Sequence, residues 1–309
     1  MSAEDLLRDL RREGYSWGAA VKFFRVTLAR VSRGLPEHPE LVRPVATTAL
    51  GLFTIQFGAA LVLSSQLERR IGVAYLIASS LLLLLASFWV LIHIGLLHGS
   101  SDGQRVIRMP LPVAITMLRL VSIPAIVLLA HLHLWTSVVW LFAASAFTDV
   151  LDGVVARVFH LESNVGALLD PLTDILFNSS VFVVLSQEGV VPWWVTSLVL
   201  TRYGILAGGT AYLYLFHGPV RIQPTLFGKL TGVLTTLLLG FLLLGLSAWS
   251  QPTQHRLKEV FDVGLGVLGL ATIIQVVFIG LANRSPRAEP AAEEHRPGKV
   301  VGEIRWPRE

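Results

Sequence analysis

The chain has 309 residues, of which 53% are hydrophobic and 15% charged, and its formal net charge is +4. This composition is typical of an integral membrane protein, and the modest positive charge suits contact with anionic lipid rather than nucleic acid. The chain has no cysteine, which excludes disulfides, thiolate metal sites and a cysteine nucleophile.

The N-terminal segment, residues 1–43, is polar and basic, with apolar residues at helical spacing. Such a pattern predicts one or two amphipathic helices on the cytoplasmic membrane surface. A solvated helical extension fits the same pattern equally well. Neither interpretation assigns a catalytic role to this segment.

Eight apolar segments follow, each long enough to cross a bilayer as a helix. They cover roughly 45–65, 72–97, 112–131, 134–157, 165–186, 191–216, 228–250 and 258–283. We therefore predict an all-α integral membrane protein. The first two spans, within residues 44–98, lack charged residues and form a two-helix transmembrane extension. A six-helix core follows in residues 99–283, and the proline-containing polar tail, residues 284–309, is predicted to be disordered.

Basic residues set the expected orientation of these spans. With the N-terminus inside, the cytoplasmic segments hold Arg105, Arg108, Arg157, Arg221, Lys229 and both basic termini, whereas the outer loops hold Arg69, Arg70, Arg256 and Lys258. The positive-inside rule then predicts that both termini are cytoplasmic, in a bacterial cell membrane.

Residues 147–176 contain four aspartates within otherwise apolar sequence. Asp149 and Asp152 are i,i+3 neighbours on one predicted helix, and Asp170 and Asp174 are i,i+4 neighbours on the next. Two helices joined by a short turn would present four carboxylates to one another at the cytoplasmic membrane edge. Such a cluster is costly without cations.

Carboxylate oxygens suit hard divalent ions, and two Mg²⁺ or Mn²⁺ ions would balance the four charges. Gly153, Ala156 and Gly166 each lie one helical turn from an aspartate and leave room for a bulky ligand. Arg157, the basic residue nearest in sequence, matches phosphate geometry. The stretch therefore predicts a metal-held phosphate site.

The string from Asp149 to Asp174 reads D-x2-D-G-x2-A-R-x8-G-x3-D-x3-D. It resembles the signature of the CDP-alcohol phosphotransferase family, also called the CDP-alcohol phosphatidyltransferase family, with every fixed position filled. The nearest members are those resembling phosphatidylglycerophosphate synthase. The resemblance covers residues 99–283 and implies a six-helix catalytic domain and a homodimer.

The resemblance also implies an activity, the transfer of a phosphatidyl group from a CDP-alcohol to an acceptor hydroxyl in phospholipid biosynthesis. CDP-diacylglycerol is the expected donor, and CMP leaves. The aspartates are then the ligands of two metal ions, and Asp174 is also the general base. The CDP-alcohol site is expected to comprise Thr116, Gly153, Ala156, Arg157 and Gly166.

The third span begins PVAITMLRLVSIP and is similar to the family pattern P-N-x-x-T-x-x-R-x-x-x-x-P, with Val113 at the asparagine position. Four cations are candidates for an acceptor phosphate: Arg119, Arg202, Arg221 and Lys229. Alternatively, Arg119 snorkels to the surface, and Arg202 pairs with Asp174 or caps a carbonyl. Ile175 and Thr231 stand where phosphatidylglycerophosphate synthases often have lysine, which leaves the acceptor open.

The four aspartates are also compatible with two other classes of protein. A divalent-cation or proton transporter would use buried aspartates, and a structural membrane scaffold would retain the motif without activity. The small residues at one-turn offsets favour the enzyme, because a transport path needs ligands but has no use for that added space.

Overall fold

The computed structural model describes residues 39–92, 111–158, 164–217, 226–248 and 251–282, with a few isolated positions between 18 and 29. These ranges form eight helices: α3 (Pro39–Gln66), α4 (Arg69–Ile92), α5 (Leu111–His131), α6 (Trp135–Val158), α7 (Asn164–Gln187), α8 (Trp193–His217), α9 (Leu226–Ala248) and α10 (Gln251–Ala282). Each predicted span corresponds to one helix, and the described residues contain no strand. The predicted all-α class is confirmed. The predicted N-terminal segment lies outside these ranges apart from the isolated positions and residues 39–43, which belong to α3, and the C-terminal tail lies outside them.

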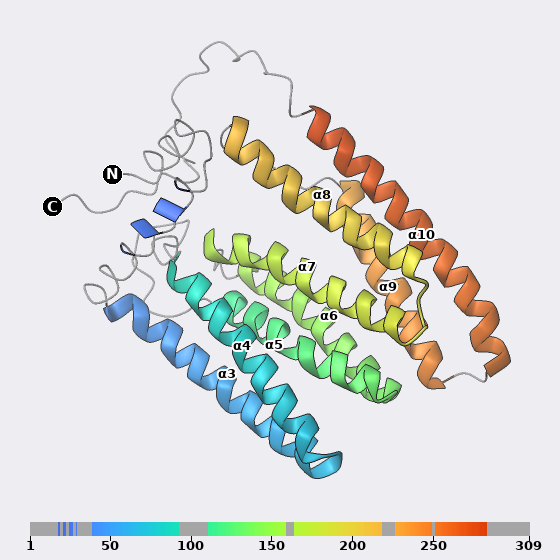
Figure 1. The fold of residues 1–309 in the computed structure, drawn as a ribbon, viewed down its shortest axis with the longest axis horizontal. Coiled ribbons are helices and arrows are strands. Elements are labelled where there is room, and N and C mark those ends of the chain that lie inside the picture. The colour runs from blue at the N-terminus through green and yellow to red at the C-terminus, as the bar shows by residue number, and fades with distance from the viewer. Residues whose placement is uncertain are drawn as a thin grey trace.

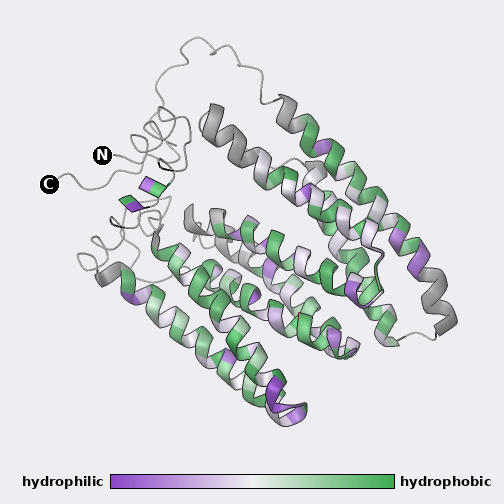
Figure 2. Ribbon diagram, in the orientation of Figure 1, coloured by the Kyte–Doolittle hydropathy of each residue, from purple (hydrophilic) through white to green (hydrophobic). Residues whose placement is uncertain are grey.

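Six of these helices are long and apolar enough to cross a membrane. In α6 the apolar stretch with described side chains is Trp135–Leu151, and it contains Asp149. Large apolar side chains such as Leu84, Trp140 and Phe278 are exposed on the outer faces, as expected where lipid replaces water. Hydrophobic residues predominate along the helices, and hydrophilic residues mark the turn between α3 and α4 (Figure 2). The chain is an integral membrane protein.

The central helix of the domain is α5, which is the most buried of the six candidate spans. It packs against α4, α6 and α7, while α3 pairs with α4, α9 lies on α6, and α10 lies on α8 and α9 (Figure 1). Met117 and Ile126 of α5 are fully buried, as are Phe182 and Leu185 of α7. Because lipid is as apolar as these side chains, close packing rather than the removal of water holds the helices together.

The extension α3–α4 depends on one close approach. A Cβ atom at Gly72 would overlap the backbone carbonyl oxygen of Ala60 and the hydroxyl of Ser64. Glycine is therefore required where α4 crosses α3. Buried Gln56 of α3 adds a hydrogen bond, its Nε2 donating to the carbonyl of Ser79 at 3.2 Å.

At one end of the bundle, α5 and α7 stop in the same way. His133 and Gly189 adopt positive φ angles of 54° and 66°, and each follows the last turn of its helix. The amide of Leu134 donates to Leu129 and that of Val190 to Leu185, at 3.0 and 2.8 Å. These are Schellman caps, which satisfy the last carbonyls and end the helix sharply. The other end of the bundle is where the acidic sequence lies.

Candidate active site

The acidic residues lie where α6 ends and α7 begins. Asp149 belongs to the C-terminal half of α6, and Asp170 and Asp174 to the N-terminal half of α7. Both helices pack against α5, whose N-terminal half therefore faces both sets of acids. Three helices, rather than the two that carry the motif, build the site.

Arg119 of α5 joins the two acidic helices. Its Nη1 forms an ion pair with Oδ1 of Asp149, and its Nη2 lies 2.9 Å from Oδ1 of Asp174. The arginine side chain is only 4% exposed, whereas the two carboxylates are 49% and 50% exposed. A guanidinium group presents N–H donors in a rigid fork, and here the two arms of the fork reach two different helices.

This geometry does not fit an arginine that snorkels to the membrane surface. An isolated charge buried in the membrane is costly, and it is normally held there by a partner. The two aspartates are such partners, and Arg119 in turn neutralises part of their charge. The suggestion that Arg119 binds a phosphate stays a prediction.

Thr116 lies one helical turn before Arg119 and is fully buried. Its hydroxyl is 2.7 Å from Oδ1 of Asp170 and 3.0 Å from the carbonyl oxygen of Pro112, and it donates to one of them at a time. On α7, the Asn178 side chain donates to the Asp174 carbonyl at 2.8 Å. Two side chains on adjacent turns of α5 thus contact the three aspartates of the motif whose side chains are described.

The remaining predicted site residues are described only in part. Gly153 is half-buried on α6, and Gly166 is buried on α7. The backbones of Asp152, Ala156 and Arg157 lie on α6 and that of Lys229 on α9, but these side chains are outside the described part, as is all of Arg221.

Arg202 lies on α8, with its guanidinium carbon 5.3 Å from the Tyr203 ring centroid. Among the described side chains it forms no ion pair with Asp174, so that alternative is wrong. Its Nε is buried and has no hydrogen-bond partner in the same set. A buried donor without an acceptor is costly, and a bound anion would relieve that cost.

The carboxylates suit a divalent cation by their chemistry, since hard ions prefer oxygen ligands. The described contacts of Asp149, Asp170 and Asp174 all use Oδ1, which leaves Oδ2 of each for other ligands. Within the described residues, however, no three acidic or histidine side chains gather around one point. Because Arg119 lies between Asp149 and Asp174, a cation shared by these two would stand beside the guanidinium or displace it.

Sequence reasoning missed that Arg119 is the counter-ion of the acids. It considered only Arg157, the basic residue nearest along the chain, whereas the arginine that pairs with Asp149 is 30 residues away. The available signal was the arginine itself, because a charge inside an apolar span needs a partner.

The fold and site define a class of protein, an all-helical membrane protein with a buried, charge-paired site at one end of its bundle. The model of the CDP-alcohol phosphatidyltransferase family matches residues 109–279, which is more than half of the chain. The chain therefore belongs to the CDP-alcohol phosphatidyltransferase family. The extension α3–α4 precedes the matched region.

Curated relatives support this assignment. The chain is 37% identical over 121 residues to the "Putative cardiolipin synthase" of Mycobacterium tuberculosis H37Rv, covering 38% of this chain and 56% of that protein. It is 38% identical over 94 residues to the "Probable phosphatidylglycerophosphate synthase" of the same strain, covering 28% and 45%. A "CDP-diacylglycerol--glycerol-3-phosphate 3-phosphatidyltransferase 2" from Arabidopsis thaliana is 35% identical over 96 residues, covering 28% and 41%. The chain thus spans about half the length of the mycobacterial relatives it matches.

Proposed function

We propose that the protein is a membrane phosphatidyltransferase that moves a phosphatidyl group from CDP-diacylglycerol to an acceptor hydroxyl and releases CMP. The observation that carries the proposal is that two α5 side chains contact the acids, Arg119 pairing with Asp149 and Asp174 and Thr116 lying 2.7 Å from Asp170. These acids belong to the motif that resembles the family signature. The printed name of the Arabidopsis relative, which includes CDP-diacylglycerol, supports the choice of donor.

In the proposed reaction the acceptor oxygen attacks the phosphorus that carries the diacylglycerol. A new phosphorus–oxygen bond forms, and the bond to the bridging oxygen breaks, so that CMP leaves with that oxygen. The hydroxyl proton passes to the Asp174 carboxylate. Arg119 engages Oδ1 of Asp174, so Oδ2 is the oxygen that takes the proton. A carboxylate is a weak base toward an alcohol, and positioning of the reactants must supply much of the rate.

Divalent cations, Mg²⁺ or Mn²⁺ and two per site, would stabilise the charge on the phosphoryl oxygens when bound. Asp149, Asp152, Asp170 and Asp174 are the residues that would hold them. Arg119 fixes the spacing of two of these ligands across α6 and α7, and Thr116 orients a third. Arg157 steadies phosphate, and the family's small positions, Gly153, Ala156 and Gly166, leave room for the nucleotide.

Arg202 favours an acceptor that bears a phosphate. Its buried Nε has no acceptor among the described residues, and a phosphate oxygen would satisfy it. Arg221 and Lys229 are the further candidates for this contact. We propose a homodimer with cytoplasmic termini, in which CMP leaves directly into the cytoplasm.

The first prediction is that transfer requires a divalent cation. Protein purified in detergent and treated with EDTA should release no CMP from CDP-diacylglycerol with any acceptor in a panel of glycerol 3-phosphate, phosphatidylglycerol, inositol and serine. Titration with Mg²⁺ or Mn²⁺ should restore CMP release. Undiminished release from metal-free protein would contradict the proposed role of the aspartates. Divalent-cation flux into liposomes without CMP release would favour a transporter instead.

The same titration with Mg²⁺ or Mn²⁺ tests whether the Thr116 hydroxyl contributes to cation binding. Thr116→Val keeps the shape but removes the hydroxyl beside Asp170, so the cation concentration for half-maximal activity should rise by about 10–100-fold, the usual effect of losing a group that orients a metal ligand. Thr116→Ser keeps the hydroxyl and serves as the matched control, with a titration close to that of the wild type. If valine and serine behave alike, the hydrogen bond to Asp170 has no part in cation binding.

A further inference from the structure

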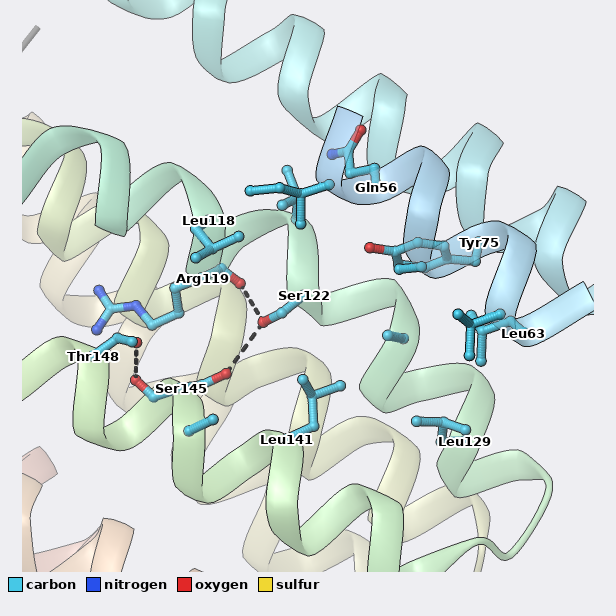
Figure 3. Close-up of a pocket in the computed structure, with 16 residues that line it drawn as sticks. Gln56, Leu63, Tyr75, Leu118, Arg119, Ser122, Leu129, Leu141, Ser145 and Thr148 are labelled. Atoms are coloured by element: carbon cyan, nitrogen blue, oxygen red, sulfur yellow. Dashed lines mark hydrogen bonds between the residues drawn. The ribbon is translucent and has the colours of Figure 1, made fainter. Parts of the chain in front are cut away.

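A cavity of about 430 Å³ lies between the extension and the core, beside the contact of α4 with α5. Its walls come from α3 and α4 on one side and from α5 and α6 on the other (Figure 3). Apolar side chains such as Leu63 and Leu141 form most of the lining. Tyr75 contributes an aromatic ring from α4, and the Ser122 and Ser145 hydroxyls, 3.2 Å apart, hydrogen-bond to each other.

The cavity leads to the candidate active site. Arg119 and Thr148 lie at one end of it and Leu129 at the other (Figure 3). Arg119 is the residue that holds Asp149 and Asp174, so this end of the cavity adjoins the acids. Between Arg119 and Leu129, helix α5 rises by about 15 Å. That distance is half of a hydrocarbon core roughly 30 Å thick, and therefore the depth of one leaflet.

We propose that this cavity holds one acyl chain of the phosphatidyl donor, so that α3 and α4 form a wall of the lipid-binding site. The inference rests on the proposed function and extends it to a part of the chain that precedes the residues matched by the family model. An apolar slot one leaflet deep, beginning at the ion-paired arginine, suits a lipid whose phosphate lies at the aspartates.

The position of the cavity favours the donor over a lipid acceptor. In CDP-diacylglycerol only the glycerol unit separates the reacting phosphorus from the acyl esters. In a lipid acceptor a whole headgroup, with its own phosphate, lies between the attacking hydroxyl and the chains. A slot that starts beside Arg119 therefore meets the chains of the donor.

The inference can be tested by filling the slot from α3. Ala59 lines the cavity and lies outside the catalytic machinery, so Ala59→Phe should displace the acyl chain and misplace the phosphorus. We expect kcat/KM for dipalmitoyl CDP-diacylglycerol to fall by about tenfold or more, since small displacements of a reacting group are costly. The dihexanoyl donor, whose chains are much shorter, should lose far less activity than the dipalmitoyl donor. Ala74→Phe, at an exposed position of α4, is the matched control and should leave both donors unaffected. Equal losses for both donors, or none, would overturn the inference.

A second measurement needs neither a variant nor turnover. CDP-diacylglycerol with a diazirine in mid-chain should, on illumination, label α3 and α5 residues that line the cavity. Unlabelled CDP-diacylglycerol should suppress this labelling, and phosphatidylcholine with the same chains should not. If phosphatidylcholine suppresses the labelling as well as unlabelled CDP-diacylglycerol does, the occupant is bulk lipid. If phosphatidylglycerol suppresses the labelling more strongly than unlabelled CDP-diacylglycerol does, the occupant is a lipid acceptor. Either result overturns the inference. Specific labelling without CMP release would instead retain the cavity assignment and reject the proposed reaction.

Discussion

Replacing Asp174 with asparagine should reduce kcat for CMP release by about a thousandfold, within the range expected for loss of a general base. Asparagine keeps the shape of the side chain, and it leaves the ion pair between Arg119 and Asp149 in place. It loses the negative charge that binds cations and the basic oxygen that accepts the proton. The fold should therefore survive while the chemistry fails, as measured by thermal unfolding and CMP release on the same preparation.

Two controls separate the roles of Asp174. Glu188→Gln makes the same kind of change at the opposite end of α7, where Glu188 contacts His131 at 2.5 Å, and should leave activity within about twofold of the wild type because it is remote from the reacting groups. Raising the Mg²⁺ concentration should not restore Asp174→Asn if the residue is the base. Recovery of the Asp174→Asn variant at high Mg²⁺ would show that Asp174 only binds the cation. Activity of this variant above a tenth of the wild type would show that Asp174 is not the general base.

Arg119→Leu should cost both stability and activity. The substitution removes the buried guanidinium that pairs with two carboxylates. Breaking a buried ion pair typically costs about 3–5 kcal/mol. Because Asp149 and Asp174 are about half exposed, we expect a loss near the lower limit, measured by unfolding in detergent without divalent ions. Arg119→Lys should recover only part of it, since a single ammonium lacks the fork that reaches both helices.

The stabilisation of each variant by Mg²⁺ tests this prediction most directly. If Arg119 neutralises the acids, then Mg²⁺ should stabilise Arg119→Leu more than the wild type, because a ligand that binds only the folded state stabilises it by mass action. Arg202→Leu is the control, since it removes another intramembrane arginine that forms no ion pair with the described aspartates. Equal destabilisation by the two leucine variants, with equal responses to Mg²⁺, would show that the ion pairs of Arg119 have no special effect.

Much of the fold was predictable because a bilayer restricts what can cross it. A helix needs about 20 apolar residues to span. Each of the eight predicted segments corresponds to one helix, and six of the helices have a described stretch long and apolar enough to cross a membrane. Boundaries were less predictable, since α3 begins at Pro39, before the predicted span at 45, although a proline is well tolerated at the start of a helix. The order in which helices pack was not predictable, because spans without charged residues, such as those of α3 and α4, carry no pattern that selects a neighbour.

The site was predictable in part for a similar reason. The spacing of Asp149, Asp170 and Asp174 along the chain fixes which face of each helix they occupy. It does not fix what they meet on a third helix. The contact between Thr116 and Asp170, which are 54 residues apart, arises from tertiary packing, and neither the pairing of Arg119 nor the cavity beside it has a local signature.

The most direct test of the proposed reaction follows the phosphorus that carries the diacylglycerol. CDP-diacylglycerol labelled with ³²P at that position should be incubated with the purified protein, Mg²⁺ and each acceptor, and the products separated into lipid and water-soluble fractions. Attack at this phosphorus predicts that the label passes into a new phospholipid containing the acceptor, with unlabelled CMP in equal amount. Label recovered in a water-soluble nucleotide, or no acceptor-dependent lipid in the presence of Mg²⁺, would contradict the proposed phosphatidyl transfer.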